Sequence, residues 1–436
     1  MEFIKQYWKK ALFAILLLSL FIPLTVKTFN LFSEEPLGGV TIETEKPILN
    51  DSTWFQGLYQ EQQEKYINEN MGMHNTLIRL NNQINFSLYK KTSAKKVVIG
   101  KENYIFENNY ISATTGADFV GNDKINSLTN QAKECQDILD NMSIKLLFVF
   151  APGKATYFSE YIPDQFLTDD NNITTNYHEL VESCQTKGLN FIDFNSWFLK
   201  MKDTTSYPLF PKAGIHWTTY GMYLSADSII KKIESDISKD IPELLLSDIE
   251  ISEEQRGNEY DLGNLLNLLY PIKTYELAYP KFGYKQTDRY RPKVLVIGDS
   301  FYWSLYYSGI PSNIFNSLEF WYYSSKYYND GTDKPQAEVK DIDILSEISK
   351  FEYIIILQTD GGLNNFGFGF FNKIIKAQNN PDKTSDIQEY IDKISNDPKW
   401  MIQIKEKAKQ RRISVEEMIE IDAEYMYNQD NEISTQ

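Results

Sequence analysis

A buried strand that ends in a hydroxyl constrains this chain more than any other feature. Residues 294–301 read Val-Leu-Val-Ile-Gly-Asp-Ser-Phe, an apolar run that stops at Gly298-Asp299-Ser300. Strands covered on both faces have this near-continuous apolar pattern, and open parallel sheets carry their chemistry beyond the carboxyl ends of the strands. We therefore expect Ser300 at the functional edge of such a sheet. The alternative is a helix N-cap, which would also leave nearby backbone N–H groups to stabilise an oxyanion.

Apolar strands and amphipathic helices alternate along the middle of the chain. Strands are expected at residues 144–150, 189–194, 293–297 and 353–357, and stripes of apolar residues at helical spacing separate them. This alternation predicts an α/β fold with a mainly parallel sheet that helices cover on both faces. Residues 238–292 fit neither pattern and read as an irregular insertion.

The flanking regions divide the rest of the chain. Residues 33–53 read as an extended linker, 54–89 as helices interrupted at Gly72, and 96–111 as a hairpin. The chain is polar and helical after about residue 375. We expect an anchor at 1–32, a linker and helical entry region at 33–95, the α/β domain at 96–374 and a helical tail at 375–436. The tail fits a partner-binding segment or a solvated cap.

The amino-terminal segment predicts export. Lys5, Lys9 and Lys10 precede an apolar run over residues 11–26, and Glu34 and Glu35 follow it. Basic residues stay on the cytoplasmic side of a membrane, so the main part of the chain would lie outside. Because no small-residue cleavage site is evident, we favour an uncleaved anchor over a signal peptide. The expected location is the cell inner membrane, with a single pass and a periplasmic or extracellular main domain.

Composition narrows the classes of function. The formal net charge of -16 disfavours nucleic acid as a partner, because an acidic body repels phosphates. Three histidines without zinc spacing predict no metal site, and nothing in the sequence indicates a cofactor. The two cysteines, Cys135 and Cys184, lie on apolar helical stripes. They fit two buried thiols or, in an exported chain, one disulfide.

His216 is the natural partner for Ser300. A serine that attacks a carbonyl needs a base to take its proton, and imidazole is the usual one. His216 stands in Gly214-Ile215-His216-Trp217-Thr218, on a loop that leads into a predicted helix. Histidine beside tryptophan also fits an ordinary packed side chain, so its role as base is a hypothesis.

No acidic residue lies within five positions of His216 to orient its ring. Three more distant aspartates remain as supporting acids. Asp193 ends a predicted strand, Asp299 adjoins Ser300, and Asp360 ends the last predicted core strand. Each of them equally fits a cap or turn residue.

Several segments in order resemble one family, the SGNH-hydrolase-like proteins of bacterial exopolysaccharide O-acetylation, of the alginate AlgX/AlgJ type. The resemblance covers roughly residues 54–365. It rests on Trp54-Phe55-x-Gly57 with Glu64-x-Tyr66 and Asn82, Gly100 to Phe106, Ala151 to Tyr157, His216-Trp217-Thr218 with Gly221, and Gly298 to Phe301. The histidine block precedes the serine block, as in this family, whereas ordinary SGNH esterases place the serine near the start.

The resemblance implies an SGNH-hydrolase-like three-layer sandwich with Ser300 as nucleophile and His216 as base. The family usually has Asp two residues before the histidine, and here that position is Gly214. A triad aspartate contributes about 10⁴-fold to the rate of well-studied hydrolases. Three outcomes therefore stay open: another acid substitutes, a Ser-His dyad suffices, or the domain is inactive.

Aromatic residues crowd the stretch after Ser300, and rings with polar tips suit sugar faces. We expect Tyr302, Trp303 and Trp217, with Lys154 near a strand end, to contact substrate. The alternative is core and interface packing, which we expect to claim most of the aromatic residues.

These observations lead to three hypotheses of function. The first is a membrane-anchored O-acetyltransferase, or its helper, that acetylates an exported polysaccharide through an acyl-serine. The family implies a multi-spanning membrane acyltransferase as acetyl donor. The second is an inactive carbohydrate-binding or scaffold protein of the same export system, which Gly214 favours. The third is a carbohydrate esterase.

Overall fold

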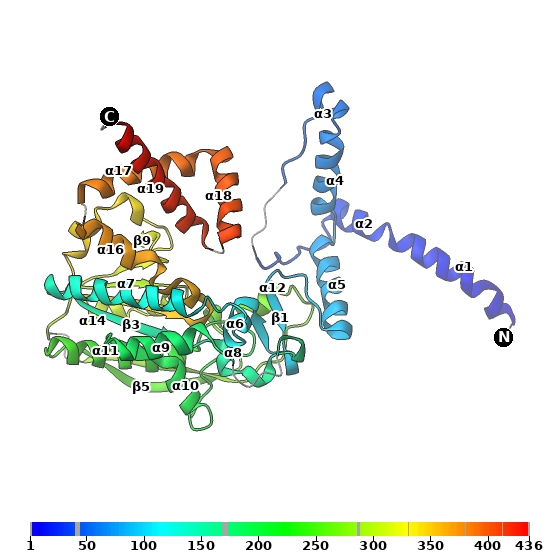
Figure 1. The fold of residues 1–436 in the computed structure, drawn as a ribbon. Coiled ribbons are helices and arrows are strands. Elements are labelled where there is room, and N and C mark those ends of the chain that lie inside the picture. Colours follow the sequence, from blue (N-terminus) through cyan, green and yellow to red (C-terminus); the bar gives the residue numbers. More distant parts are fainter. Residues whose placement is uncertain are drawn as a thin grey trace. The chain divides into compact units, whose positions relative to one another are not determined.

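The computed structural model describes residues 2–39, 44–167, 173–285, 288–329, 331–379, 381–411 and 413–434 (Figure 1). The chain divides into two compact units. The first consists of Met1–Asn108, Lys212–Ile215 and Gln255–Tyr275, and the second of Asn109–Pro211, His216–Glu254 and Glu276–Gln436. Both Ser300 and His216 belong to the second unit.

Among the described residues, the second unit is built on a seven-stranded sheet in the order β10-β9-β8-β7-β11-β3-β4. The strands are β3 (Lys145–Ala151), β4 (Phe191–Asp193), β7 (Val294–Gly298), β8 (Glu319–Tyr322), β9 (Lys326–Tyr328), β10 (Ala337–Glu338) and β11 (Tyr353–Thr359). From β8 to β4 all neighbours are parallel, and β9 and β10 are antiparallel. The expected α/β fold with a mainly parallel sheet is confirmed.

Helices cover both faces of this sheet, because alternate residues of each buried strand point to opposite sides. Ile354 and Ile356 of β11 share one apolar cluster with α7 (Asn122–Asn141), α9 (Asn176–Thr186), α15 (Ile344–Ile348) and α16 (Phe370–Asn379). Ile355 and Leu357 face α11 (Thr219–Ile237), α13 (Tyr302–Tyr306) and α14 (Ile310–Ile314). Figure 1 shows α7 and α11 on opposite sides of β3. The result is three layers.

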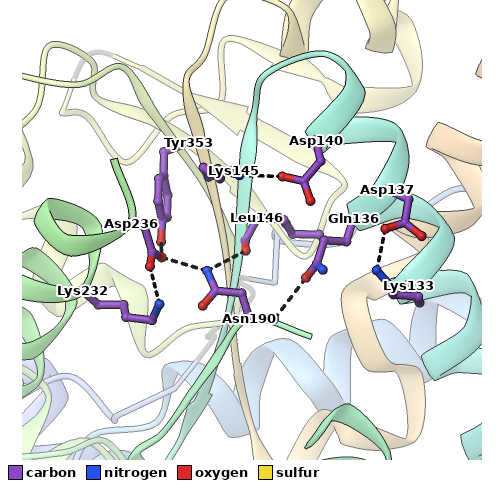
Figure 2. A network of polar contacts seen from close by, with 10 residues as sticks. All are labelled: Lys133, Gln136, Asp137, Asp140, Lys145, Leu146, Asn190, Lys232, Asp236 and Tyr353. Carbon is purple, nitrogen blue, oxygen red and sulfur yellow. Dashed lines mark hydrogen bonds and ion pairs between the residues drawn. The ribbon is translucent and has the colours of Figure 1, made fainter. Parts of the chain in front are cut away.

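A polar network closes the amino-terminal edge of the sheet, as Figure 2 shows. Asp236 at the end of α11 accepts hydrogen bonds from Asn190 (2.8 Å) and from the Tyr353 hydroxyl (2.5 Å), and it pairs with Lys232. Burial raises the pKa of Asp236, but these bonds outweigh burial and lower the pKa below its ordinary value. Asn190 also receives support from Gln136 of α7, whose side-chain oxygen accepts from its N–H. The network therefore joins α7 and α11 to the amino-terminal ends of the strands. Ser300 follows β7 at the opposite, carboxyl edge of the sheet.

The expectation of an irregular insertion over residues 238–292 is wrong. Two long strands, β5 (Glu243–Ser252) and β6 (Leu277–Lys285), form an antiparallel ribbon with a register shift between Leu246 and Asp248. The error has a physical cause, because β5 is largely exposed and its strand partner lies far along the chain. Its sequence therefore lacks the strong apolar alternation of a strand on a core.

Shorter elements complete the second unit: α6 (Asn108–Thr114), α8 (Lys154–Tyr157), η2 (Ser159–Tyr161), η3 (Asp164–Phe166), α10 (Phe194–Met201), η5 (Val339–Asp341) and η6 (Asp360–Gly369). The tail forms α17 (Pro381–Asn396), α18 (Pro398–Arg411) and α19 (Val415–Ser434), with an apolar cluster of its own around Ile404 and Met418. Cys135 and Cys184 are unpaired buried thiols, and burial raises the pKa of both.

The first unit is mainly helical. Its elements are α1 (Glu2–Ser19), α2 (Ile22–Phe29), α3 (Asp51–Phe55), α4 (Leu58–Asn70), α5 (His74–Tyr89), the hairpin β1 (Val97–Ile99) and β2 (Ile105–Glu107) with η1 (Lys101–Asn103), η4 (Gly257–Tyr260) and α12 (Asp261–Leu265). Gly72 separates α4 from α5 and the hairpin spans 97–107, close to the positions expected from the sequence. The stretch Tyr7–Phe29 is long and apolar enough to cross a membrane, as an anchor or a signal sequence would be.

Candidate active site

Ser300 lies directly beyond β7, and its hydroxyl meets His216. The distance from Ser300 Oγ to His216 Nε2 is 3.0 Å, which is a hydrogen bond. Ser300 is half-buried and His216 is 9% exposed, so the pair is shielded but not sealed. Ser300 is not a helix cap, because α13 begins after Phe301 and has no side-chain cap. This arrangement can transfer a proton from a serine hydroxyl to an imidazole.

The loop that carries His216 is fixed by the residues that follow it. The indole N–H of Trp217 donates to Ser304 Oγ (2.7 Å), which ties the loop to α13. Thr218 caps α11, because its hydroxyl accepts from the Gly221 N–H (3.1 Å). The Phe301 ring packs against the imidazole, with 4.9 Å between ring centroids. Contacts on both sides therefore limit the rotation of His216.

Asp299 holds the turn that presents Ser300. One carboxylate oxygen accepts from the Phe301 N–H (3.0 Å), and the other accepts from both the N–H and the hydroxyl of Thr359 (each 2.7 Å). Thr359 is the last residue of β11, so these bonds join the ends of two neighbouring strands. Asp299 thus holds the serine turn in place. The Phe301 N–H is already hydrogen-bonded to the Asp299 carboxylate.

Burial governs the ionisation of the groups around this turn. It raises the pKa of the Asp299 carboxyl, against which the bonds from Thr359 and Phe301 and the charge of His216 act. Burial and the Asp299 charge raise the pKa of Tyr110 well above its usual range. Tyr110 is therefore a neutral phenol. Its hydroxyl lies 3.1 Å from Thr359 Oγ1 and so contacts the residue that bonds Asp299.

The other two aspartates considered as supporting acids are engaged elsewhere. Asp193 caps α10 through the Ser196 N–H (2.9 Å) and accepts from the Tyr177 hydroxyl (2.8 Å). Asp360 accepts from Thr156 Oγ1 (2.5 Å), and burial raises its pKa to about 7. Asp193 thus has the cap role of the alternative interpretation, whereas Asp360 joins two segments that lie 204 positions apart in the chain.

Position 214, where the family usually has Asp, has no room for a side chain. A Cβ on Gly214 would lie 2.6 Å from the backbone oxygens of Asn258 and Glu259, both in the first unit. Asp261 of the same unit accepts from the Ile215 N–H (3.0 Å), so a carboxylate fixes the residue that immediately precedes His216. Asp261 lies 46 positions from Ile215 along the chain, so the sequence gives no sign of this contact.

The residues expected to contact substrate differ in exposure. Lys154, Trp217 and Tyr302 are 1%, 2% and 5% exposed, and burial favours a packing role for the two aromatic rings. Trp303 is half-buried and stacks on the exposed ring of Tyr307 at 5.4 Å. Of these four residues, Trp303 has the side chain most open to solvent.

Sequence reasoning missed Thr359, Ser304 and Tyr110. Thr359 had a signal, because it directly precedes Asp360 at the end of a predicted strand. Ser304 and Tyr110 had none, since their roles depend on contacts between distant segments. Among the described residues, no group of three or more His, Cys, Asp or Glu side chains could hold a metal ion.

The second unit is thus a three-layer α/β domain with a serine and a histidine in hydrogen-bond contact at the carboxyl edge of its sheet. Residues 97–302 match the family model described as "SGNH hydrolase-like domain, acetyltransferase AlgX". The resemblance found in the motifs is thus confirmed over residues 97–302, which are similar to this acetyltransferase family. No curated protein matches the chain in sequence.

Three solved structures are similar to the chain. The O-acetyltransferase domain of Pseudomonas putida AlgJ is 14% identical, with coverage of 64% of this chain and 99% of that one and a TM-score of 0.43. Pseudomonas aeruginosa AlgX is 13% identical over 65% and 66%, with a TM-score of 0.41. Bacillus cereus PatB1 is 12% identical over 56% and 91%, with a TM-score of 0.35.

Proposed function

We propose that this protein is a membrane-anchored O-acetyltransferase that acetylates an exported cell-surface polysaccharide through an acetyl group carried on Ser300. The observation that carries the proposal is the 3.0 Å contact between Ser300 Oγ and His216 Nε2 within a domain of an acetyltransferase family. The apolar stretch Tyr7–Phe29 supports an anchor in the cell inner membrane, with the main domain outside.

The reaction has two half-steps. In the first, Ser300 Oγ attacks the carbonyl carbon of the donor's acetyl group while His216 Nε2 takes the serine proton. The donor's leaving group departs with that proton, and the acetyl ester on Ser300 remains. In the second, a sugar hydroxyl attacks this ester and gives its proton to His216, which returns it to Ser300 as the acetyl group leaves.

The donor in this proposal is a multi-spanning membrane acyltransferase that brings acetyl groups across the membrane. An anchor at the amino terminus would keep the domain beside such a partner. The acceptor is the polysaccharide itself, and no cofactor or metal takes part in either half-step.

Ser300→Ala in the producing organism tests this function. The variant, expressed at the wild-type level, is expected to leave the surface polysaccharide without the acetyl groups that the wild-type protein adds. Asp193→Asn is the control, because Asp193 caps α10 and bonds Tyr177, so acetylation should persist. Unchanged acetylation in the Ser300→Ala strain would overturn the enzymatic function.

A second function, a non-catalytic scaffold of the same export system, is favoured by Gly214. The structure leaves no room for the usual carboxylate there. A scaffold would give full polymer acetylation with Ser300→Ala and reduced acetylation only when the whole protein is deleted. A carbohydrate esterase, the third hypothesis, would instead raise the acetyl content of the polymer in the Ser300→Ala strain.

A further inference from the structure

An exposed tyrosine occupies a left-handed turn between β8 and β9. Tyr323 and Ser324 both have φ near +51°, although neither is glycine. A bulky L-residue avoids this region because its Cβ crowds the neighbouring carbonyl, whereas Gly and Asn adopt it readily. Tyrosine therefore costs stability at this position, and such strain is often retained where a side chain is needed for function.

The turn is fixed to the strand that carries the nucleophile. The Tyr323 N–H donates to the carbonyl of Gly298 (2.9 Å), two residues before Ser300. This bond holds the start of the turn against the carboxyl end of β7. Tyr323 thus belongs to the same sheet edge as the Ser300–His216 pair.

The Tyr323 ring is presented rather than packed. It is 45% exposed, and its edge contacts Phe368 with ring centroids 5.3 Å apart. The ring of the preceding residue, Tyr322, also contacts it, with 4.5 Å between the ring centroids. Two neighbouring aromatic side chains therefore orient the ring and leave much of it in solvent.

Tyr322, which precedes Tyr323, lies opposite Gly298 in the register of β7 and β8. Burial raises the pKa of Tyr322, a hydrogen bond with Tyr323 lowers it, and the charge of Asp299 raises it. The Tyr322 hydroxyl therefore interacts with both the Tyr323 side chain and the charge of Asp299, the residue before Ser300. Tyr323, whose backbone N–H is bonded two residues before Ser300, thus carries an exposed phenol at the sheet edge that holds the reacting serine.

We propose that Tyr323 forms an acceptor subsite, on which a pyranose ring of the polysaccharide stacks while its hydroxyl approaches the acetyl group on Ser300. The inference rests on the proposed function and assigns a position to its second half-step. An aromatic face suits the C–H face of a sugar, and the phenol suits its hydroxyls. Trp303 and Tyr307 are less suited, because they stack on each other at an interplanar angle of 14°.

The test uses the full-length protein with Tyr323→Asn, because Asn tolerates left-handed backbone but has no ring. Three measurements apply: the Tm, the rate at which 4-nitrophenyl acetate acetylates Ser300, and the acetyl content of polysaccharide in the producing organism. We expect a Tm about 2 °C higher, a rate of Ser300 acetylation within about twofold of wild type, and polymer acetylation at least about fivefold lower. Tyr323→Phe, which keeps the ring, should retain most of the polymer acetylation.

Ser324→Gly is the matched control. It relieves the same backbone strain at the adjacent position and removes no aromatic ring. Because Ser324 is only 1% exposed, its side chain does not reach a polymer. We expect a similar rise in Tm with unchanged polymer acetylation. This variant separates the effect of strain from the effect of the ring.

Two results would overturn the subsite. In one, Tyr323→Asn leaves polymer acetylation at the wild-type level. In the other, acetylation of Ser300 and of the polymer fall together, which marks a structural role. Failure of the proposed function is distinct, because it requires polymer acetylation that does not depend on Ser300 at all.

Discussion

The Ser300 hydroxyl and the His216 imidazole form a hydrogen bond of 3.0 Å across 84 positions of the chain. Each group reaches this point through separate supports. Asp299 fixes the serine turn to β11, while Trp217 and Thr218 fix the histidine loop to α13 and α11. Substitutions can therefore disturb the serine turn and the histidine loop separately.

The first prediction concerns Asp299→Asn. The asparagine amide has one oxygen and one NH₂ group, so it can accept a hydrogen bond at one end only. Its NH₂ group would then face the backbone N–H of either Thr359 or Phe301, and two donors cannot bond each other. We expect a loss of about 2–3 kcal/mol in the free energy of unfolding and slow acetylation of Ser300. Urea denaturation and single-turnover acetylation measure both. Thr359→Ser keeps the hydroxyl donor and should stay near wild type, and an Asp299→Asn variant as stable as wild type would contradict the support role.

The second prediction concerns Ser304→Ala, which removes the acceptor of the Trp217 indole N–H. A buried donor without a partner costs about 1–3 kcal/mol, and the loop beside His216 loosens. We expect slower Ser300 acetylation in a folded protein. Ser349→Ala removes a similar bond to a carbonyl three residues earlier at an exposed site and serves as control. Equal acetylation rates in the two variants would show that the Trp217 contact does not position His216.

The third prediction concerns Gly214→Asp, the substitution that would restore the family's usual residue. The new Cβ would meet the backbone of Asn258 and Glu259 at 2.6 Å, so we expect a destabilised protein with lower activity. Gly214→Ala should show a similar loss of stability, because the Cβ and not the charge causes it. Thermal unfolding and the acetylation rate measure both, and a gain of activity in Gly214→Asp would refute this reading of the loop.

The fourth prediction concerns Asp360, whose pKa burial raises from 3.8 to about 7. Between these two values the folded chain keeps a proton that the unfolded chain releases, so stability falls as pH rises from about 4 to 7. Asp360→Asn should remove this dependence and stabilise the protein at pH 8 by about 1–4 kcal/mol. Urea midpoints at pH 5 and pH 8 measure it, and parallel changes in both proteins would exclude Asp360 as the source.

The buried centre of the fold was predictable because its strands have a simple signature. Residues 294–298 and 353–357 are apolar on both faces, and the limits of β7 and β11 in the structure lie within a few residues of those expected. The pairing of β5 with β6 was not, since exposed strands lack that signature and their register depends on a distant partner. The strands β8 and β9 were not expected either, because they lie within the aromatic stretch after Ser300.

The candidate site divides in the same way. Chemistry alone predicted that a serine beyond a strand needs an imidazole, and the structure brings Ser300 and His216 together. The supports were beyond the sequence, because Thr359 and Ser304 act through contacts that only the folded sheet creates. The lack of space at Gly214 was also invisible, since the atoms that fill it come from residues 258 and 259.

The most direct measurement is the site of acetylation after exposure to an activated acetyl ester. The wild-type protein is incubated with 4-nitrophenyl acetate, quenched in acid and mapped by peptide mass spectrometry. The account predicts one acetyl group on the peptide that contains Ser300, a rate about 10²–10⁴-fold lower in His216→Ala, and no label in Ser300→Ala. A wild-type peptide that stays unlabelled, or labelling of Ser300 that proceeds equally fast without His216, would contradict it.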